Sequence, residues 1–155
     1  MDEKGFVIGI CQASKRILSV KSIKPGQCKG QMQDGSREFI TCIAAVSAGG
    51  EKISPSLIYQ SESGDMQDSW LKDFNFSNQH AYFALSPKGW TSDKHGVEWL
   101  SRFDEQTSKI VGNTQEKRLL ILDGHSSHIT MEFLQKAMAL NILVVIFPPH
   151  STHRL

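Results

Sequence analysis

RLLILDGHSSHIT, residues 118–130, decides how the second half of the chain is expected to fold. The apolar run Leu119 to Leu122 is typical of a buried strand, and it stops at an acid, Asp123. Thr130 can cap a following helix whose apolar residues share one stripe: Phe133, Leu134, Ala137 and Met138. A second buried-type run, Leu143 to Phe147, ends at two prolines. Strand, helix and strand within about thirty residues predict a βαβ unit with parallel strands and a right-handed crossover.

The first half of the chain predicts an antiparallel meander. Apolar runs at 6–10 and 17–20 indicate a hairpin, because polar residues separate them and a Lys-Pro-Gly turn at 24–26 ends the second run. Further strands are expected at 39–46 and 55–59. Three or four antiparallel strands therefore precede the βαβ unit.

Between these halves, residues 60–80 are polar and predict a long connection with one helical turn. Ser92 can then cap a helix with one face formed at three- and four-residue spacing by Val97, Leu100, Phe103 and Thr107. We expect Trp90 and Trp99 to anchor the core around this helix rather than to stack on bases. The order of elements predicts an α/β fold with a mixed sheet flanked by helices.

Composition agrees with an ordinary globular chain of 155 residues forming one domain, with 39% hydrophobic and 21% charged residues. The three cysteines, Cys11, Cys28 and Cys42, form no C-x-x-C pair, which argues against a disulfide framework and favours a reducing compartment. No run reaches the roughly 18 apolar residues of a membrane span and the start lacks a secretion signal, so we expect a soluble protein. Residues 1–37 hold seven Lys or Arg against three Asp or Glu, and this basic end could meet a polyanion or simply be solvated.

Asp123 lies at the carboxyl end of its strand, which is where ligands bind in open α/β sheets. An aspartate before a glycine can simply stabilise the turn. GHSSH, residues 124–128, also begins like a nucleophile elbow, but its fifth residue is not glycine. The pairs His125/His128 and His150/His153 have zinc-like spacing. A hard Mg²⁺ site is a further alternative, with Asp2 as a second carboxylate if its strand lies beside that of Asp123.

Several sequence blocks resemble one family. MDEKGF (1–6), SPKGWTS with GVEWLSRF (86–103), LLILDGHSSH (119–128) and FPPHSTHRL (147–155) are similar, in order, to the catalytic domain of pogo/Tigger-type DDE transposases. This DDE-1 superfamily includes domesticated centromere-like and jerky-like relatives. The resemblance implies an RNase H-like fold, with a five-stranded mixed sheet whose first three strands are antiparallel. It also implies a nuclear, metal-dependent DNA endonuclease or transposase that cleaves phosphodiesters and transfers strands.

The resemblance also assigns the site. Asp2 and Asp123 correspond to the first two catalytic acids and would hold two Mg²⁺ or Mn²⁺ ions, whereas strand alternation points Glu3 to the other face. Five polar residues would orient that site or contact the DNA backbone, with turn stabilisation the alternative: His125, Ser126, His128, His150 and His153. Basic residues of the predicted hairpin would contact DNA phosphates: Lys15, Arg16, Lys21 and Lys24.

The chain departs from the family pattern at both ends. The family's third acid follows the Pro-Pro-His block, and this sequence stops at Leu155 before reaching it. The helix-turn-helix domains that read transposon ends are also missing, so residues 1–155 are expected to be a single catalytic domain truncated at both ends. Activity of this chain alone is therefore uncertain. The alternative is a domesticated, inactive DNA-binding or protein-interaction module, and a homo-oligomer of the full-length protein stays open.

Overall fold

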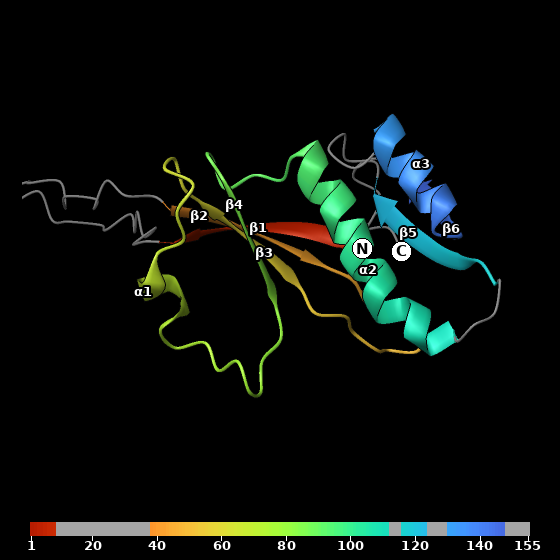
Figure 1. Ribbon diagram of the computed structural model, residues 1–155, viewed down its shortest axis with the longest axis horizontal. Helices are drawn as coiled ribbons and strands as arrows, with labels where there is room; N and C mark the ends of the chain where they lie inside the picture. The colour runs from red at the N-terminus through yellow and green to blue at the C-terminus, as the bar shows by residue number, and fades with distance from the viewer. Residues whose placement is uncertain (9–37, 112–115, 124–129, 148–155) are drawn as a thin grey trace, which may run out of the picture.

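The computed structural model describes residues 1–8, 38–111, 116–123 and 130–147 (Figure 1). The elements in these ranges are β1 (Asp2–Ile8), β2 (Glu38–Ala44), β3 (Ser56–Gln60), α1 (Asp68–Leu71), β4 (Tyr82–Ser86), α2 (Asp93–Val111), β5 (Arg118–Asp123), α3 (Met131–Ala139) and β6 (Ile142–Phe147). The chain is thus a mixed α/β structure, as predicted. The expected hairpin falls mostly within residues 9–37, outside the described residues.

Most strands form a four-stranded sheet in the order β1-β2-β3-β4. β2 runs antiparallel to β1 and to β3, which confirms a meander at the start of the chain. β5 and β6 form a separate two-stranded parallel sheet, joined through α3 as the predicted βαβ unit. Thr130 caps α3, because its hydroxyl oxygen accepts a 3.2 Å hydrogen bond from the amide of Phe133.

The structure differs from the expected five-stranded sheet in two ways: it has an additional strand, β4, and its strands form two separate sheets. β4 (YFALS) lies parallel to β3 at the outer edge of the larger sheet, where the sequence analysis placed no strand. Its aromatic and apolar residues directly follow the polar connection, and α1 is only the single helical turn expected there. Between β1 and β5 there is no ladder in the described residues, so the strands divide into two sheets.

A single core joins both sheets to α2 and α3. Its buried side chains come from β2, β3, β5, β6 and the two helices: Ile43, Ile58, Trp99, Leu100, Phe103, Leu120, Leu122, Phe133, Ala137 and Ile142. The predicted helix around Trp99 is confirmed, and Trp99 is 2% exposed. The same prediction is wrong for Trp90, which is 59% exposed because it lies in the turn before α2 and covers the ring of Phe39 from outside, with centroids 4.3 Å apart.

Arg118 fixes the start of β5 against both helices. Its guanidinium donates to the Asp104 carboxylate at 2.6 Å, to the Thr107 hydroxyl at 3.0 Å and to the carbonyl of Leu140 at 2.6 Å. Only 13% of this side chain is exposed, so these bonds replace water that the charge has lost. Arg118 therefore connects β5 to α2 and to the end of α3.

The connection between β3 and β4 covers part of the larger sheet with aromatic rings. Trp70 of α1 stacks on Tyr59 at 4.8 Å, and Phe74 packs edge-on against Phe83 at 5.1 Å.

No helix in the described ranges is both long and apolar enough to cross a membrane.

Candidate metal site at the junction of the two sheets

One hydrogen bond joins the beginning of β1 to the end of β5. The amino group of Met1 donates to the carbonyl oxygen of Ile121 at 2.8 Å, between residues 120 positions apart in sequence. Figure 1 shows β5 ending beside the point where β1 begins. Met1 also packs against the common core. Asp2 is the residue after Met1, and Asp123 lies two residues after Ile121. The backbones of both acids therefore lie near this hydrogen bond.

Asp2 opens β1 and is exposed to solvent. One of its carboxylate oxygens, Oδ1, accepts a 2.9 Å hydrogen bond from the amide of Glu3. Its cross-strand partner is the exposed Ala44, whereas Glu3 is half-buried opposite Ile43, a core residue. The two acids therefore face opposite sides of β1, as alternation along a strand predicts.

Asp123 is the last residue of β5 and is paired in register with Phe147, the last residue of β6. The strand that carries it is held by its buried side: Leu122 is 1% exposed and Leu120 is also buried. The side chain of Asp123 lies outside what the structure describes. Its backbone position at a strand end is the one that the sequence predicted.

Comparison with known proteins decides the family. The model of the DDE superfamily endonuclease family matches residues 36–155, which is more than half of the chain. The chain belongs to the DDE superfamily. It is also 34% identical over 155 residues to a Cochliobolus lunatus protein named "MFS-type transporter clz9". The match covers 99% of this chain but only 16% of that protein. No solved structure matches the chain.

The remaining residues predicted for the DDE site lie outside the described ranges: Lys15, Arg16, Lys21, Lys24, His125, Ser126, His128, His150 and His153. Their roles at a metal or on DNA stay predictions, as do the zinc and nucleophile-elbow alternatives. Within the described residues, no group of three or more His, Cys, Asp or Glu side chains could hold a metal ion.

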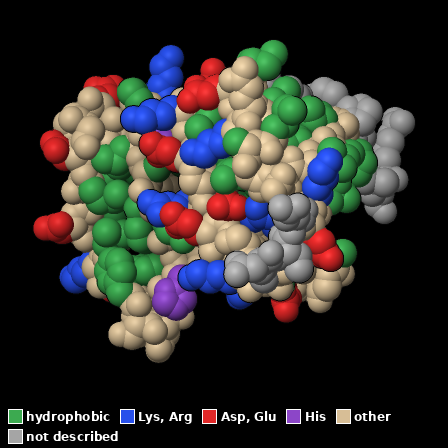
Figure 2. All heavy atoms as spheres, turned by 45° about the vertical axis from the view of Figure 1, so that its right-hand side comes forward, with side chains coloured by type: hydrophobic (Ala, Val, Ile, Leu, Met, Phe, Trp, Pro, Cys, Tyr) green, Lys and Arg blue, Asp and Glu red, His purple; other side chains and the backbone are tan. Residues whose placement is uncertain are grey.

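On the face shown in Figure 2, the described basic and acidic side chains are interspersed over the middle of the DDE domain. Two ion pairs on α2 likewise combine both signs of charge: Lys94 with Glu98 at 3.9 Å, and Arg102 with Glu105 at 3.0 Å. The described part of this face therefore presents both signs of charge rather than a basic strip. The basic residues predicted to contact phosphates belong to residues 9–37, outside the described ranges.

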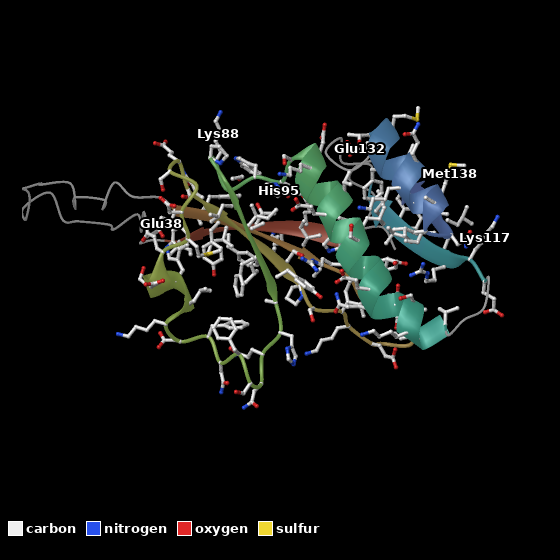
Figure 3. The ribbon with its side chains drawn as sticks, viewed as in Figure 1. Glu38, Lys88, His95, Lys117, Glu132 and Met138 are labelled. Carbon is white, nitrogen blue, oxygen red and sulfur yellow. The ribbon has the colours of Figure 1, made fainter. Side chains whose placement is uncertain are left out.

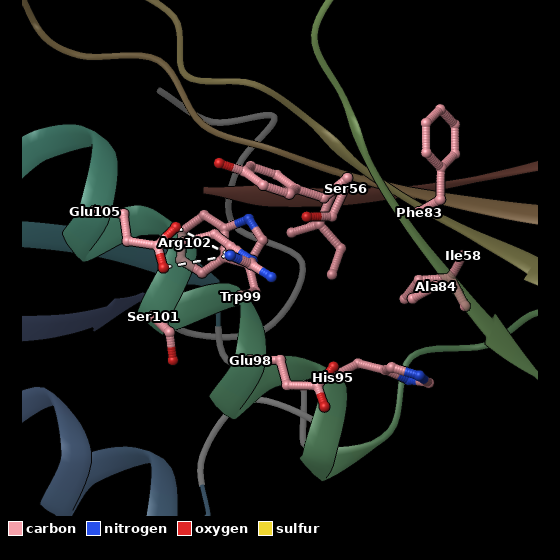
Figure 4. A pocket seen from close by; sticks show the side chains of 12 residues that line it. Ser56, Ile58, Phe83, Ala84, His95, Glu98, Trp99, Ser101, Arg102 and Glu105 are labelled. Carbon is pink, nitrogen blue, oxygen red and sulfur yellow. Dashed lines mark hydrogen bonds and ion pairs between the residues drawn. The ribbon is translucent and has the colours of Figure 1, made fainter.

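A hollow between α2 and the sheet was not anticipated from the sequence. It has a volume of about 430 Å³ and is lined by β2, β3, β4 and α2 (Figure 4). Arg102 extends over the ring of Tyr82, 4.8 Å from its centroid, and is held by Glu105. The hydrogen bond and the charge of Glu105 raise the pKa of the Arg102 guanidinium above its ordinary value. Periodicity could not reveal this hollow, because its polar residues come from a strand and a helix far apart in sequence.

Proposed function

We propose that the chain is the catalytic core of a metal-dependent, transposase-like nuclease that cuts DNA phosphodiesters and transfers the cut strand. Asp2 and Asp123 would be its metal-holding carboxylates. The observation that carries this proposal is the hydrogen bond from Met1 to Ile121, which brings residues 2 and 123 to neighbouring strand ends. Family membership supplies the reaction class, because residues 36–155 match a DDE superfamily endonuclease.

The residues at the junction fit a divalent cation by their donor chemistry. Mg²⁺ prefers carboxylate oxygens, binds through one or two of them and keeps several waters, so it needs an open position. Asp2 is exposed, and Glu3 occupies only one of its oxygens within the described residues. Asp123 is the last residue of β5, so a cation bound at this strand end would lie next to its backbone position. The exposed carboxylate of Asp2 leaves room there for a phosphate.

In this proposal the fold holds the two carboxylates in place for the metal ions. The buried Leu120 and Leu122 anchor β5 in the core and so fix the backbone that carries Asp123. Divalent ions held there would activate the attacking water or 3′-hydroxyl and stabilise the leaving oxygen. His125 and His128 would follow Asp123 closely enough to orient it or to contact DNA. The basic residues of 15–24 would bind phosphates and make DNA affinity salt-dependent.

We further propose an RNase H-like arrangement and a nuclear location. Crossing the junction from β1 to β5 gives the strand sequence β4-β3-β2-β1-β5-β6, with β1 near the centre and the βαβ unit at one side. This order supports the fold expected from the family, with β4 as an addition at the far edge. A nuclear location follows from the proposed DNA substrate.

Nicking of supercoiled plasmid tests the proposed function. The 155-residue chain and a longer form of the protein are incubated with Mg²⁺ or Mn²⁺, alongside Asp2→Asn and Asp123→Asn. Each substitution removes a charge needed by the cation and should lower the nicking rate by more than about a hundredfold. Glu3→Gln is the matched control, because Glu3 faces the other side of β1 and should retain activity. Metal-dependent nicking that persists in Asp123→Asn would refute the assignment.

A further inference from the structure

β4 forms an open edge of the larger sheet. Its ladder with β3 begins with the amide of Tyr82 donating to the carbonyl of Pro55 at 2.9 Å and ends with Ser61 donating to Ser86 at 2.9 Å. In a parallel ladder, every second residue of a strand bonds to a given neighbour. Tyr82 and Ser86 bond to the β3 side, so the amides and carbonyls of Phe83 and Leu85 point away from β3. The carbonyl of Leu85 accepts from the Nε2–H of His95 at 3.1 Å. Within the described residues, no hydrogen bond reaches the amide or the carbonyl of Phe83.

His95 closes only one end of this edge. Its Nδ1 accepts from the amide of Ser92 at 3.2 Å, which leaves the proton on Nε2 for the Leu85 carbonyl. Figure 3 shows His95 at the beginning of α2, next to the connection from β4. The histidine therefore ties the helix to one end of the strand, and the segment around Phe83 remains available for pairing.

The hollow beside β4 is lined by a hydroxyl that can bond to an occupant. Ser56 is 8% exposed, and its hydroxyl has no hydrogen bond within the described part of the chain. In Figure 4 this hydroxyl points into the hollow toward Trp99 and Arg102. The hollow thus presents a donor and acceptor to an occupant.

The charges around the hollow favour a cationic occupant. Glu98, Glu105 and Arg102 line it, and Arg102 is already engaged with Glu105 at 3.0 Å. Lys94 approaches Glu98 only to 3.9 Å and is almost fully exposed. Among the described residues, the carboxylate of Glu98 therefore has no close ion pair: Lys94 lies at 3.9 Å, and the charge of Arg102 acts on it without a hydrogen bond. A DNA phosphate would meet two carboxylates here, whereas a lysine or arginine side chain would meet a partner for its charge.

We propose that the β4 edge and this hollow bind an extended basic peptide from another protein. The peptide pairs with the main-chain groups of Phe83 as an added strand, the recognition mode known as β-augmentation. A lysine or arginine of the peptide enters the hollow toward Glu98, and Ser56 supplies a hydrogen bond. The volume of about 430 Å³ is sufficient for one such side chain with its hydration. This surface lies on β4, away from β1 and β5, and the inference does not depend on the proposed nuclease activity.

Fluorescence anisotropy with a defined probe tests the proposal. The probe is a labelled ten-residue peptide of alternating valine and threonine with one central lysine, and its twin carries glutamate there. The 155-residue chain should bind the lysine peptide more tightly than the glutamate peptide. In an amide NMR spectrum, the lysine peptide should shift the Phe83 and Leu85 signals most. Equal binding of both peptides, or shifts centred on another element, would overturn the proposal.

Two pairs of variants separate the charge from the strand pairing. Glu98→Gln should weaken binding of the lysine peptide about three- to fivefold, as loss of a partly exposed ion pair does. Glu132→Gln makes the same charge change on α3, away from the hollow, and should leave binding unchanged (Figure 3). Equal affinities of these two variants would contradict the role of the hollow.

Phe83→Pro removes the outward amide, a change tolerated on a sheet edge, and should abolish binding. Phe83→Ala also loses the ring but keeps the amide, so it should still bind. If Phe83→Pro does not fold, hydrogen exchange of the unaltered chain replaces it: saturating lysine peptide should slow exchange of the Phe83 amide at least about tenfold. Unchanged exchange would refute strand addition. A 20-base-pair DNA duplex that shifts the same amides would also refute it, because the edge would then serve nucleic acid.

Discussion

The amino group of Met1 lies 2.8 Å from the carbonyl oxygen of Ile121, and this contact joins the two sheets of the domain. On one side of it β1 enters an antiparallel ladder with β2, and on the other β5 enters a parallel ladder with β6. The two acids assigned by family resemblance, Asp2 and Asp123, lie one and two residues beyond this contact. Predictions about the junction therefore concern both the stability of the fold and the proposed site.

Leu122 and Leu119 should respond very differently to truncation. Leu122 is 1% exposed in the common core, so Leu122→Ala should lower the free energy of unfolding by about 3 kcal/mol. Leu119 lies on the same strand but is 57% exposed, and Leu119→Ala should cost less than about 1 kcal/mol. Urea denaturation followed by circular dichroism measures both. Similar losses in the two variants would show that the alternation along β5 is not as described.

Arg118 should be needed for the position of β5. Arg118→Met leaves the Asp104 carboxylate and the Leu140 carbonyl without their donor and should cost about 3 kcal/mol of unfolding free energy. Arg118→Lys should recover little, because one ammonium group cannot reach three acceptors on two elements. Lys94→Met, at a nearly fully exposed position, should change stability by less than about 0.5 kcal/mol. Full recovery by lysine would contradict the bridging role.

Cys42 should be a slowly reacting thiol. Burial raises the pKa of the Cys42 thiol above its ordinary value, so less thiolate exists at a given pH in the folded protein than in the unfolded chain. Folding should therefore lose stability as pH rises above the ordinary thiol pKa. In a Cys11→Ser, Cys28→Ser background, alkylation by iodoacetamide at pH 8 should be slow and should accelerate in urea. Rapid alkylation of the folded protein would contradict the burial of this residue.

Local sequence patterns correctly predicted the strands and helices whose formation is determined by residues close together in the sequence. The apolar run 119–122, the Thr130 cap and the stripe containing Phe133 gave the βαβ unit with nearly correct bounds. β4 was missed, although Tyr82–Ser86 is a short aromatic and apolar run followed by a proline, a signal typical of a strand. A run of only five residues next to a long polar connection gives a weak periodic signal, which does not distinguish a strand from part of a loop.

The site required information that no local pattern contains. The end of an apolar strand identified Asp123, whereas Asp2 was selected through the family resemblance. The Met1–Ile121 hydrogen bond in the structure shows that their strands adjoin. The hollow at Ser56 and Arg102 was not predicted, since one residue belongs to a strand and the other to a helix 46 positions later. Trp90 was predicted to anchor the core because it lies close in sequence to the amphipathic helix that carries Trp99, but it precedes that helix and is 59% exposed.

The central claim is that Asp2 and Asp123 share a divalent cation, and paramagnetic broadening of amide NMR signals by Mn²⁺ tests it most directly. Sub-stoichiometric Mn²⁺ should broaden the amides of Asp2, Glu3, Leu122 and Asp123 together. Broadening of all four should disappear in either Asp2→Asn or Asp123→Asn and persist in Glu3→Gln. Broadening that affects only one of the two strands, or that survives both aspartate substitutions, would contradict a shared metal site.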